Sequence, residues 1–85
     1  MYSENEKMLD FEYFKSINIS FFNENGHNFL AIKDKKIISF NKNIADLISE
    51  MKQKGYEIGT YLLQECKGNE SDYTNVVMRL MLNVQ

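Results

Sequence analysis

The chain has 85 residues and a net charge of −2, and it is 44% hydrophobic and 26% charged. A chain of this length forms one domain with a small core, and its apolar content is too high for a disordered tail. The lysines are scattered among acidic residues, so the basic stripe of a nucleic-acid-binding domain is missing. We therefore expect one folded domain over residues 1–85, and nucleic acid is not an expected partner.

The N-terminal residues Met-Tyr-Ser-Glu-Asn-Glu-Lys are polar and acidic, without the positive and apolar regions of a secretory signal. The sequence has no apolar run long enough to span a membrane. Its single cysteine, Cys66, cannot form an internal disulfide, which suits a reducing compartment. These features predict a cytoplasmic protein without membrane attachment.

Residues 1–7 are expected to fray, and residues 8–24 are predicted to form an amphipathic helix. The evidence is apolar spacing of three and four at Met8, Leu9, Phe11, Phe14, Ile17, Phe21 and Phe22. An alternative concerns residues 17–22, where Ile17, Ile19 and Phe21 alternate as in a strand. Asn25-Gly26 suits either reading, as a helix C-cap or as a hairpin turn.

Residues 28–40 are predicted to form an apolar β-hairpin around Asp34-Lys35. A two-residue turn there needs positive φ at Lys35, which glycine adopts more easily, so a longer loop is an alternative. The two-residue turn predicts the pairs Lys33–Lys36, Ile32–Ile37, Ala31–Ile38, Leu30–Ser39 and Phe29–Phe40.

Both faces of this hairpin are apolar in that register. One face carries Phe29, Ala31, Ile38 and Phe40, and the other carries Leu30, Ile32 and Ile37. A helix on one side would leave apolar surface on the other, so we expect the second face to need a cover.

A second helix is predicted from the N-cap Asn43 to Gly55, because Ile44, Leu47, Ile48 and Met51 form one apolar stripe. Residues 60–66 then alternate as a strand, with Thr60, Leu62, Gln64 and Cys66 on one side and Tyr61, Leu63 and Glu65 on the other. From Tyr73 to Val84 the alternation is cleaner still, and this predicts a last strand.

These elements predict an α+β fold of two layers, in the order α-β-β-α-β-β. Its sheet has four mainly antiparallel strands in the order 2-1-3-4. The long last strand, if it lies at an edge, offers free backbone groups to another chain. We expect a homodimer, because association would cover both the open edge and the exposed face.

Four stretches resemble a family of short bacterial proteins that form a domain of unknown function. They are Phe11-Glu-Tyr-Phe-Lys-Ser, Asn28-Phe-Leu-Ala-Ile-Lys-Asp-Lys-Lys-Ile-Ile, Gly59-Thr-Tyr-Leu-Leu-Gln64 and Tyr73-Thr74. The resemblance covers about residues 10–75 and implies a small α+β fold with no assigned activity. The sequence departs from the family at Lys35, where glycine is commoner, and in the apolar tail after Thr74.

Candidate chemistry is sparse, and the sequence predicts no catalytic residue, cofactor or metal. Cys66 and His27 could form a nucleophile and its base, but a buried inert thiol and a turn histidine explain them better. Glu65, Glu70 and Asp72 lack the spacing of a calcium loop. Gln64 is expected to be buried and hydrogen-bonded to backbone or to the Thr60 and Tyr73 hydroxyls.

The sequence therefore favours a small non-enzymatic interaction or regulatory domain that presents a sheet face or edge to a second copy or to a protein partner. Tyr2, Tyr13, Tyr56 and Tyr61 could anchor such an interface. The predicted interface comprises Leu30, Ile32, Ile37, Tyr61, Val77, Arg79 and Met81. The alternative is a domain that binds nucleic acid or a small ligand through Lys33, Lys35, Lys36 and nearby aromatic residues.

Overall fold

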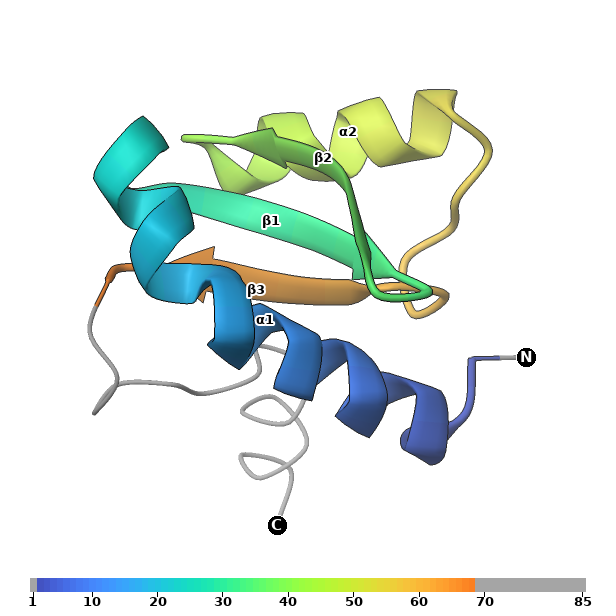
Figure 1. The fold of residues 1–85 in the computed structure, drawn as a ribbon. Coiled ribbons are helices and arrows are strands. Elements are labelled where there is room, and N and C mark those ends of the chain that lie inside the picture. Colours follow the sequence, from blue (N-terminus) through green and yellow to red (C-terminus); the bar gives the residue numbers. More distant parts are fainter. Residues whose placement is uncertain (1, 69–85) are drawn as a thin grey trace, which may run out of the picture.

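A computed structural model describes residues 2–68 of the chain. In this part the elements follow the order α1, β1, β2, α2 and β3, and the strands form an antiparallel sheet in the order β2-β1-β3 (Figure 1). The predicted α+β class with an antiparallel sheet is confirmed at this level. The predicted strand over residues 73–84 lies outside the described residues, so the four-stranded order 2-1-3-4 has no support from them.

Helix α1 (Glu4–Asn25) begins four residues earlier than predicted. The Ser3 hydroxyl accepts a hydrogen bond from the Glu6 N–H at 3.1 Å, and the Glu6 carboxylate accepts one from the Ser3 N–H at 3.3 Å. This reciprocal cap satisfies N–H groups that a helix N-terminus leaves free, so the predicted fraying was wrong for residues 4–7. The strand alternative for residues 17–22 is wrong, and the helix ends at Gly26, whose φ is 79°.

The hairpin forms around a two-residue turn, as predicted. Strands β1 (Asn28–Lys33) and β2 (Lys36–Asn41) are joined by Asp34 and Lys35, whose φ angles are 54° and 58°. Positive φ at both positions is what a type I′ turn requires. The pairs Lys33–Lys36 and Ile32–Ile37 are confirmed.

Beyond Ile37 the predicted register is wrong, because a β-bulge shifts the pairing between Ala31 and Ile32. Ile38 is the extra residue, and the observed pairs are Ala31–Ser39, Leu30–Phe40 and Phe29–Asn41. The shift moves Phe40 to the face of Leu30, where its ring lies 5.1 Å from that of Phe21 on α1. One inserted residue thus changes which helix Phe40 contacts.

The remaining elements follow local signals. Helix α2 (Ile44–Gln53) starts at the predicted N-cap Asn43, whose side chain accepts from the Asp46 N–H at 3.0 Å. Strand β3 (Leu62–Cys66) begins two residues later than predicted. The Thr60 N–H and hydroxyl both donate to the Glu57 carbonyl, at 3.1 and 2.6 Å, so the preceding residues form a turn.

The two helices cover opposite faces of the sheet (Figure 1). The core on the α1 side contains Phe14, Leu30, Ile32, Leu62 and Cys66, and the core on the α2 side contains Ala31, Leu47, Met51, Tyr61 and Leu63. The predicted two-layer arrangement was therefore wrong, because the described chain has three layers. The face that was expected to need a second molecule as its cover is covered by the chain itself.

Replacing Ser3 with alanine should lower the free energy of unfolding by about 1 kcal/mol, because the Glu6 N–H loses its acceptor at the helix start. Ser16→Ala is the matched control, since Ser16 is exposed in the helix interior, where alanine is the better helix former. Urea denaturation followed by circular dichroism measures both variants. Equal stability of Ser3→Ala and the parent chain would show that the cap contributes nothing.

Candidate functional site

The structure places the predicted interface residues in three different settings. Leu30 and Ile32 are fully buried under α1, and Tyr61 is 1% exposed on the α2 side. The interface prediction is corrected at these positions, because their side chains are already enclosed by the chain. Ile37 is partly buried against the core on the α1 side, and Val77, Arg79 and Met81 lie outside the described residues.

The outer edge of β2 has features that hinder pairing with a further strand. The bulge at Ile38 interrupts the regular ladder, Lys36 opens the strand, and Lys42 follows it. Bulges and lysines are devices by which proteins protect sheet edges. This edge is therefore a poor surface for adding another chain.

The outer edge of β3 is different. Its pairing with β1 runs from Asn28–Cys66 to Ile32–Leu62 without a register shift, and residues 62–66 include no lysine and no proline. Within residues 2–68, β3 pairs with β1 alone, so its other edge is open to a further strand in this part of the chain. Such an edge is a ready template for strand addition.

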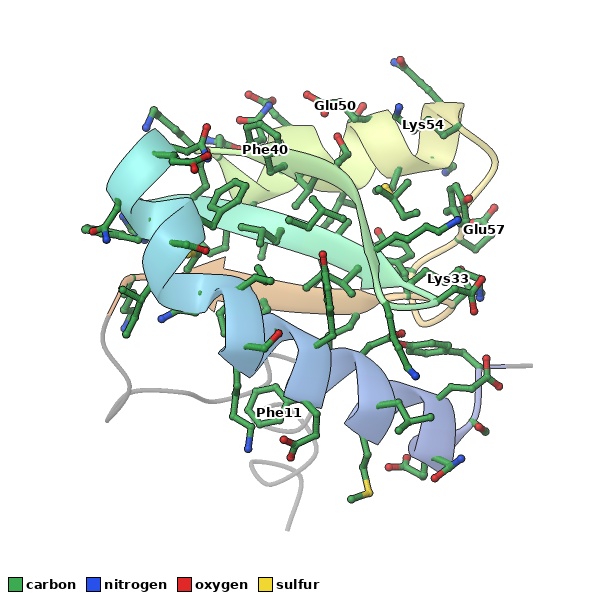
Figure 2. The ribbon with its side chains drawn as sticks, viewed as in Figure 1. Phe11, Lys33, Phe40, Glu50, Lys54 and Glu57 are labelled. Atoms are coloured by element: carbon green, nitrogen blue, oxygen red, sulfur yellow. The ribbon has the colours of Figure 1, made fainter. Side chains whose placement is uncertain are left out.

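One side of α1 carries apolar side chains around a central lysine, and we call it the α1 flank: Met8, Phe11, Lys15, Ile19 and Phe22. At 100° per residue, these five positions fall within an arc of about 80°, with Lys15 at its centre. Met8 is 64% exposed, Ile19 is also exposed, and Phe11 and Phe22 are partly buried. Figure 2 shows Phe11 on the side of α1 that points away from α2 and β2.

The contacts of α1 show that this flank lies toward β3. Asn18, beside the flank on the helix surface, accepts from the Cys66 thiol through its side-chain oxygen at 3.1 Å. Phe22 packs against Gly68, where an added Cβ would come within 2.6 Å of the ring. Phe21, on the other side, contacts Phe40 of β2. The C-terminal part of the flank, around Phe22, therefore lies near the end of β3.

Sequence reasoning missed this flank because it placed Met8, Phe11 and Phe22 in a single apolar stripe with Phe14 and Phe21. Phe14 and Met8 are six residues apart, which puts them about 120° apart on the helix. A stripe that wide exceeds what one sheet face can cover. That excess width was the available signal for a second contact surface.

The tip of the hairpin is joined to α1 by Asp10. Its side chain is 2% exposed and accepts hydrogen bonds from the Tyr2 hydroxyl and from the Lys35 N–H, the latter at 2.8 Å. The second bond holds Lys35, one of the two turn residues with a positive φ. Burial, and then the hydrogen bond to Asp10, raise the pKa of Tyr2, so its hydroxyl keeps its proton and remains a donor.

The basic turn proposed for nucleic acid has acidic surroundings. Lys33 donates to the Thr60 carbonyl at 3.0 Å and lies 5.0 Å from the centre of the Tyr2 ring, so it has an internal role. Beside the turn is a cavity of about 300 Å³, lined by Glu6, Leu9, Asp10, Asp34 and Lys35. Three carboxylates and one ammonium make a poor setting for a phosphate group.

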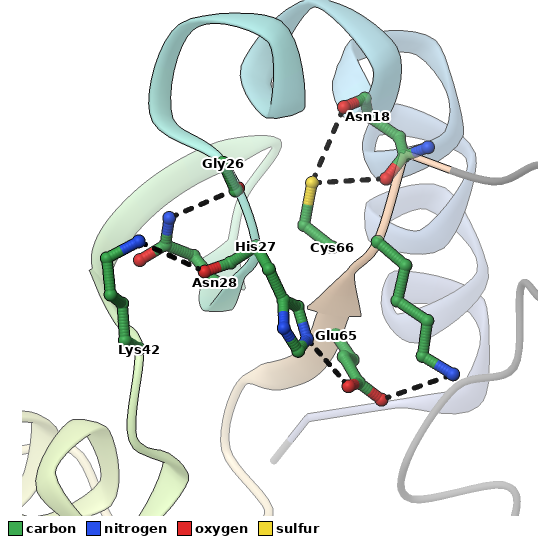
Figure 3. Close-up of polar contacts among 8 residues, drawn as sticks. Asn18, Gly26, His27, Asn28, Lys42, Glu65 and Cys66 are labelled. Atoms are coloured by element: carbon green, nitrogen blue, oxygen red, sulfur yellow. Dashed lines mark hydrogen bonds and ion pairs between the residues drawn. The ribbon is translucent and has the colours of Figure 1, made fainter.

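Cys66 and His27 do not form a catalytic pair in this structure. The Cys66 thiol is fully buried and points to Asn18, whereas His27 points to Glu65, with Nε2 2.8 Å from the carboxylate (Figure 3). Burial raises the pKa of the Cys66 thiol, which disfavours the reactive thiolate. The thiol is buried, as the sequence predicts.

The described residues contain no group of His, Cys, Asp or Glu side chains that could hold a metal ion. Glu65 is 2.8 Å from His27 and 3.7 Å from Lys67, while Glu70 and Asp72 lie outside the described residues. No helix within residues 2–68 is both long and apolar enough to cross a membrane. Gln64 is buried, as predicted.

Glu50 of α2 connects that helix to β2. It accepts hydrogen bonds from the Ser39 hydroxyl at 2.8 Å and from the Asn41 side-chain amide at 2.7 Å. These two bonds, Ser39 first, lower the pKa of Glu50 below its ordinary value of 4.5. Both donors face α2 because of the bulge at Ile38, so the bulge and this contact depend on each other.

Asp10→Ala should lower the free energy of unfolding by about 2–4 kcal/mol, because it leaves two hydrogen-bond donors without their acceptor. Tyr2→Phe should cost less, about 1 kcal/mol, since it removes one donor only. Glu12→Ala, an exposed change on the same helix, should stay within about 0.5 kcal/mol. Urea titration measures all three, and an unchanged Asp10→Ala variant would refute the role given to this carboxylate.

The contribution of Glu50 should be fully present above pH 4.5 and should disappear as the pH falls through its lowered folded-state pKa. The stability difference between the parent chain and Glu50→Gln should therefore shrink as the pH falls below 4.5. Urea unfolding at a series of pH values tests this. Glu24→Gln, on exposed α1 surface, is the control, and a pH-independent difference for Glu50→Gln would contradict the assignment.

Comparisons with protein-family models, with curated proteins and with solved structures found no match to this chain. The resemblance to a family of short bacterial proteins therefore stays a prediction. Function has to be inferred from the surfaces of the described residues.

Proposed function

We propose that the protein is a small non-enzymatic interaction domain that acts through the β3 side of its sheet. The observation that carries this proposal is the contrast between the two sheet edges: β2 is bulged and bounded by lysines, whereas β3 pairs regularly and is open among residues 2–68. Both sheet faces are covered by helices, so an edge is the better candidate than a face. Edge strands bind partners through backbone hydrogen bonds.

The complete sheet in this proposal has four strands in the order 2-1-3-4, with residues 73–84 beside β3. The apolar alternation of this segment supports the assignment. Val77, Arg79 and Met81 then lie on the fourth strand. The outer edge of that strand pairs with the same edge of a second copy in a homodimer. Isologous pairing of two equal edges is the simplest symmetric solution. A different protein partner could use the same edge.

The alternative function, binding of nucleic acid or a small ligand at the Lys33–Lys36 turn, has weaker support. Lys33 is held by the Thr60 carbonyl, and the adjacent cavity is lined mainly by carboxylates. A thiol enzyme has less support still, because Cys66 is buried and His27 is turned toward Glu65. The edge proposal uses none of these residues.

Light scattering of the full chain over about 1–100 µM should show a rise from the 10.0 kDa of one chain to twice that mass. Met81→Lys should shift the chain toward the single-chain mass, because it places a charge beside the pairing edge. Ile58→Lys is the control, since Ile58 is 63% exposed in the connection before β3. Circular dichroism checks that each variant is folded, and a single-chain mass at every concentration would refute the homodimer.

A further inference from the structure

We propose that residues 55–59, in the connection between α2 and β3, form a strap that opens locally over the buried side chain of Tyr61. The open state exposes one end of the core on the α2 side, to which Tyr61 belongs. The inference concerns this side of the sheet and is independent of the β3 edge. It follows from a buried hydroxyl without a partner and from the weak attachment of the strap.

The hydroxyl of Tyr61 is buried and has no hydrogen-bond partner among residues 2–68. The residue as a whole is 1% exposed. Burial, and then the charge of Glu57, raise the pKa of Tyr61, so the hydroxyl keeps its proton at neutral pH. A buried donor that makes no hydrogen bond costs about 1–3 kcal/mol relative to the same group in water. The closed structure therefore carries a cost that contact with water removes.

Two contacts place the strap beside this side chain. The ring of Tyr56 packs edge-on against the ring of Tyr61, with centroids 6.3 Å apart and planes at 83°. Glu57, the next residue, lies near enough for its charge to act on the Tyr61 hydroxyl. Figure 2 shows Glu57 on the connection that leads from α2 to β3. Opening the strap is therefore a local route by which water reaches the hydroxyl.

Little side-chain packing holds the strap closed. Gly55, Glu57, Ile58 and Gly59 are all exposed, and Ile58 has 63% of its surface in contact with solvent. Tyr56 is the one residue of the strap that is partly buried. Segments with few buried apolar contacts open at a lower free energy than the core around them. The strap should therefore open without unfolding of the sheet.

Glycines stand at both ends of the strap. Gly55 and Gly59 have φ angles of 94° and 92°, which other residues rarely adopt. A Cβ at either position would meet no atom within 4 Å, so these glycines serve the backbone conformation and not close packing. Beyond them, Met51 of α2 and Leu62 of β3 are fully buried. The strap thus lies between two adaptable backbone positions, each next to a fixed element.

Two backbone hydrogen bonds report the opening. The Tyr56 N–H donates to the Met51 carbonyl at 2.9 Å, and the Thr60 N–H donates to the Glu57 carbonyl at 3.1 Å. Opening breaks both bonds, so the amide hydrogens of Tyr56 and Thr60 exchange with solvent in the open state. Amides of the central strand β1 are the reference for global unfolding. In the parent chain the two strap amides should exchange at least about tenfold faster than those of β1.

Hydrogen exchange of the full chain, followed by NMR, tests the inference with Tyr61→Phe. This variant keeps the ring and removes the hydroxyl, so the closed state no longer carries the cost of the unpaired donor. Exchange of the Tyr56 and Thr60 amides should slow about fivefold or more, which corresponds to about 1 kcal/mol. Tyr56→Phe is the matched control, because its hydroxyl is not among the buried unpaired atoms, and exchange of the Thr60 amide should stay within about twofold.

Three results would overturn the inference. Unchanged exchange in Tyr61→Phe would show that the hydroxyl already has a partner, such as a bound water, or is not exposed by the opening. Equal slowing in Tyr56→Phe would show that the effect is not specific to the buried hydroxyl. Equal exchange of the strap amides and the β1 amides in the parent chain would show that the strap opens only when the whole domain unfolds.

A variant with the opposite expected effect completes the test. Gly59→Ala strains the closed strap, because alanine is disfavoured at a φ of 92°. Exchange of the Thr60 amide should therefore become about fivefold faster, while circular dichroism confirms that the variant is folded. An unchanged rate would show that the closed strap does not depend on this backbone conformation, and would contradict the role given to Gly59.

Discussion

Strand β1 is apolar on both of its faces, and the arrangement of the described chain follows from that. Leu30 and Ile32 point to one side of the sheet and Ala31 points to the other, and all three are fully buried. Full burial of a large aliphatic side chain contributes about 1.5–3 kcal/mol, so neither face can remain open to water without a large loss in a domain this small. The chain meets this constraint by placing α1 on one face and α2 on the other, with β2 and β3 on the two edges of β1.

The bulge at Ile38 lets one short strand contact both helices. Without it, Phe40 would share a face with Ala31 and Ser39 would share a face with Leu30. With it, Phe40 packs on Phe21 of α1, while Ser39 and Asn41 turn their donors to Glu50 of α2. The inserted residue also interrupts the outer edge of β2, which makes that edge a poor template for another strand. The bulge that brings β2 into contact with both helices therefore also protects its edge.

With both faces covered among residues 2–68, the surface that we propose for interaction is the β3 side of the sheet. A fourth strand would complete the ladder with its backbone. The proposed homodimer would then form at the outer edge of this strand. Interaction through an edge also fits a chain whose thiol is buried and whose lysine turn lies beside a cavity lined mainly by carboxylates.

The sequence by itself determined the features that depend on neighbouring residues. These are the start of α2 at Asn43, the two-residue turn at Asp34-Lys35 and the opposite faces of Leu62 and Leu63. The start of α1 at Glu4 also depends on a local signal, the cap formed by Ser3 and Glu6. The prediction of a helix from residue 8 did not include that signal. Only the tertiary structure decided which sheet face each helix covers, where the bulge falls and which predicted interface residues are buried. The same apolar pattern suits a two-layer and a three-layer arrangement, and the choice depends on contacts between residues far apart in the chain, such as Asp10 with Lys35 and Asn18 with Cys66.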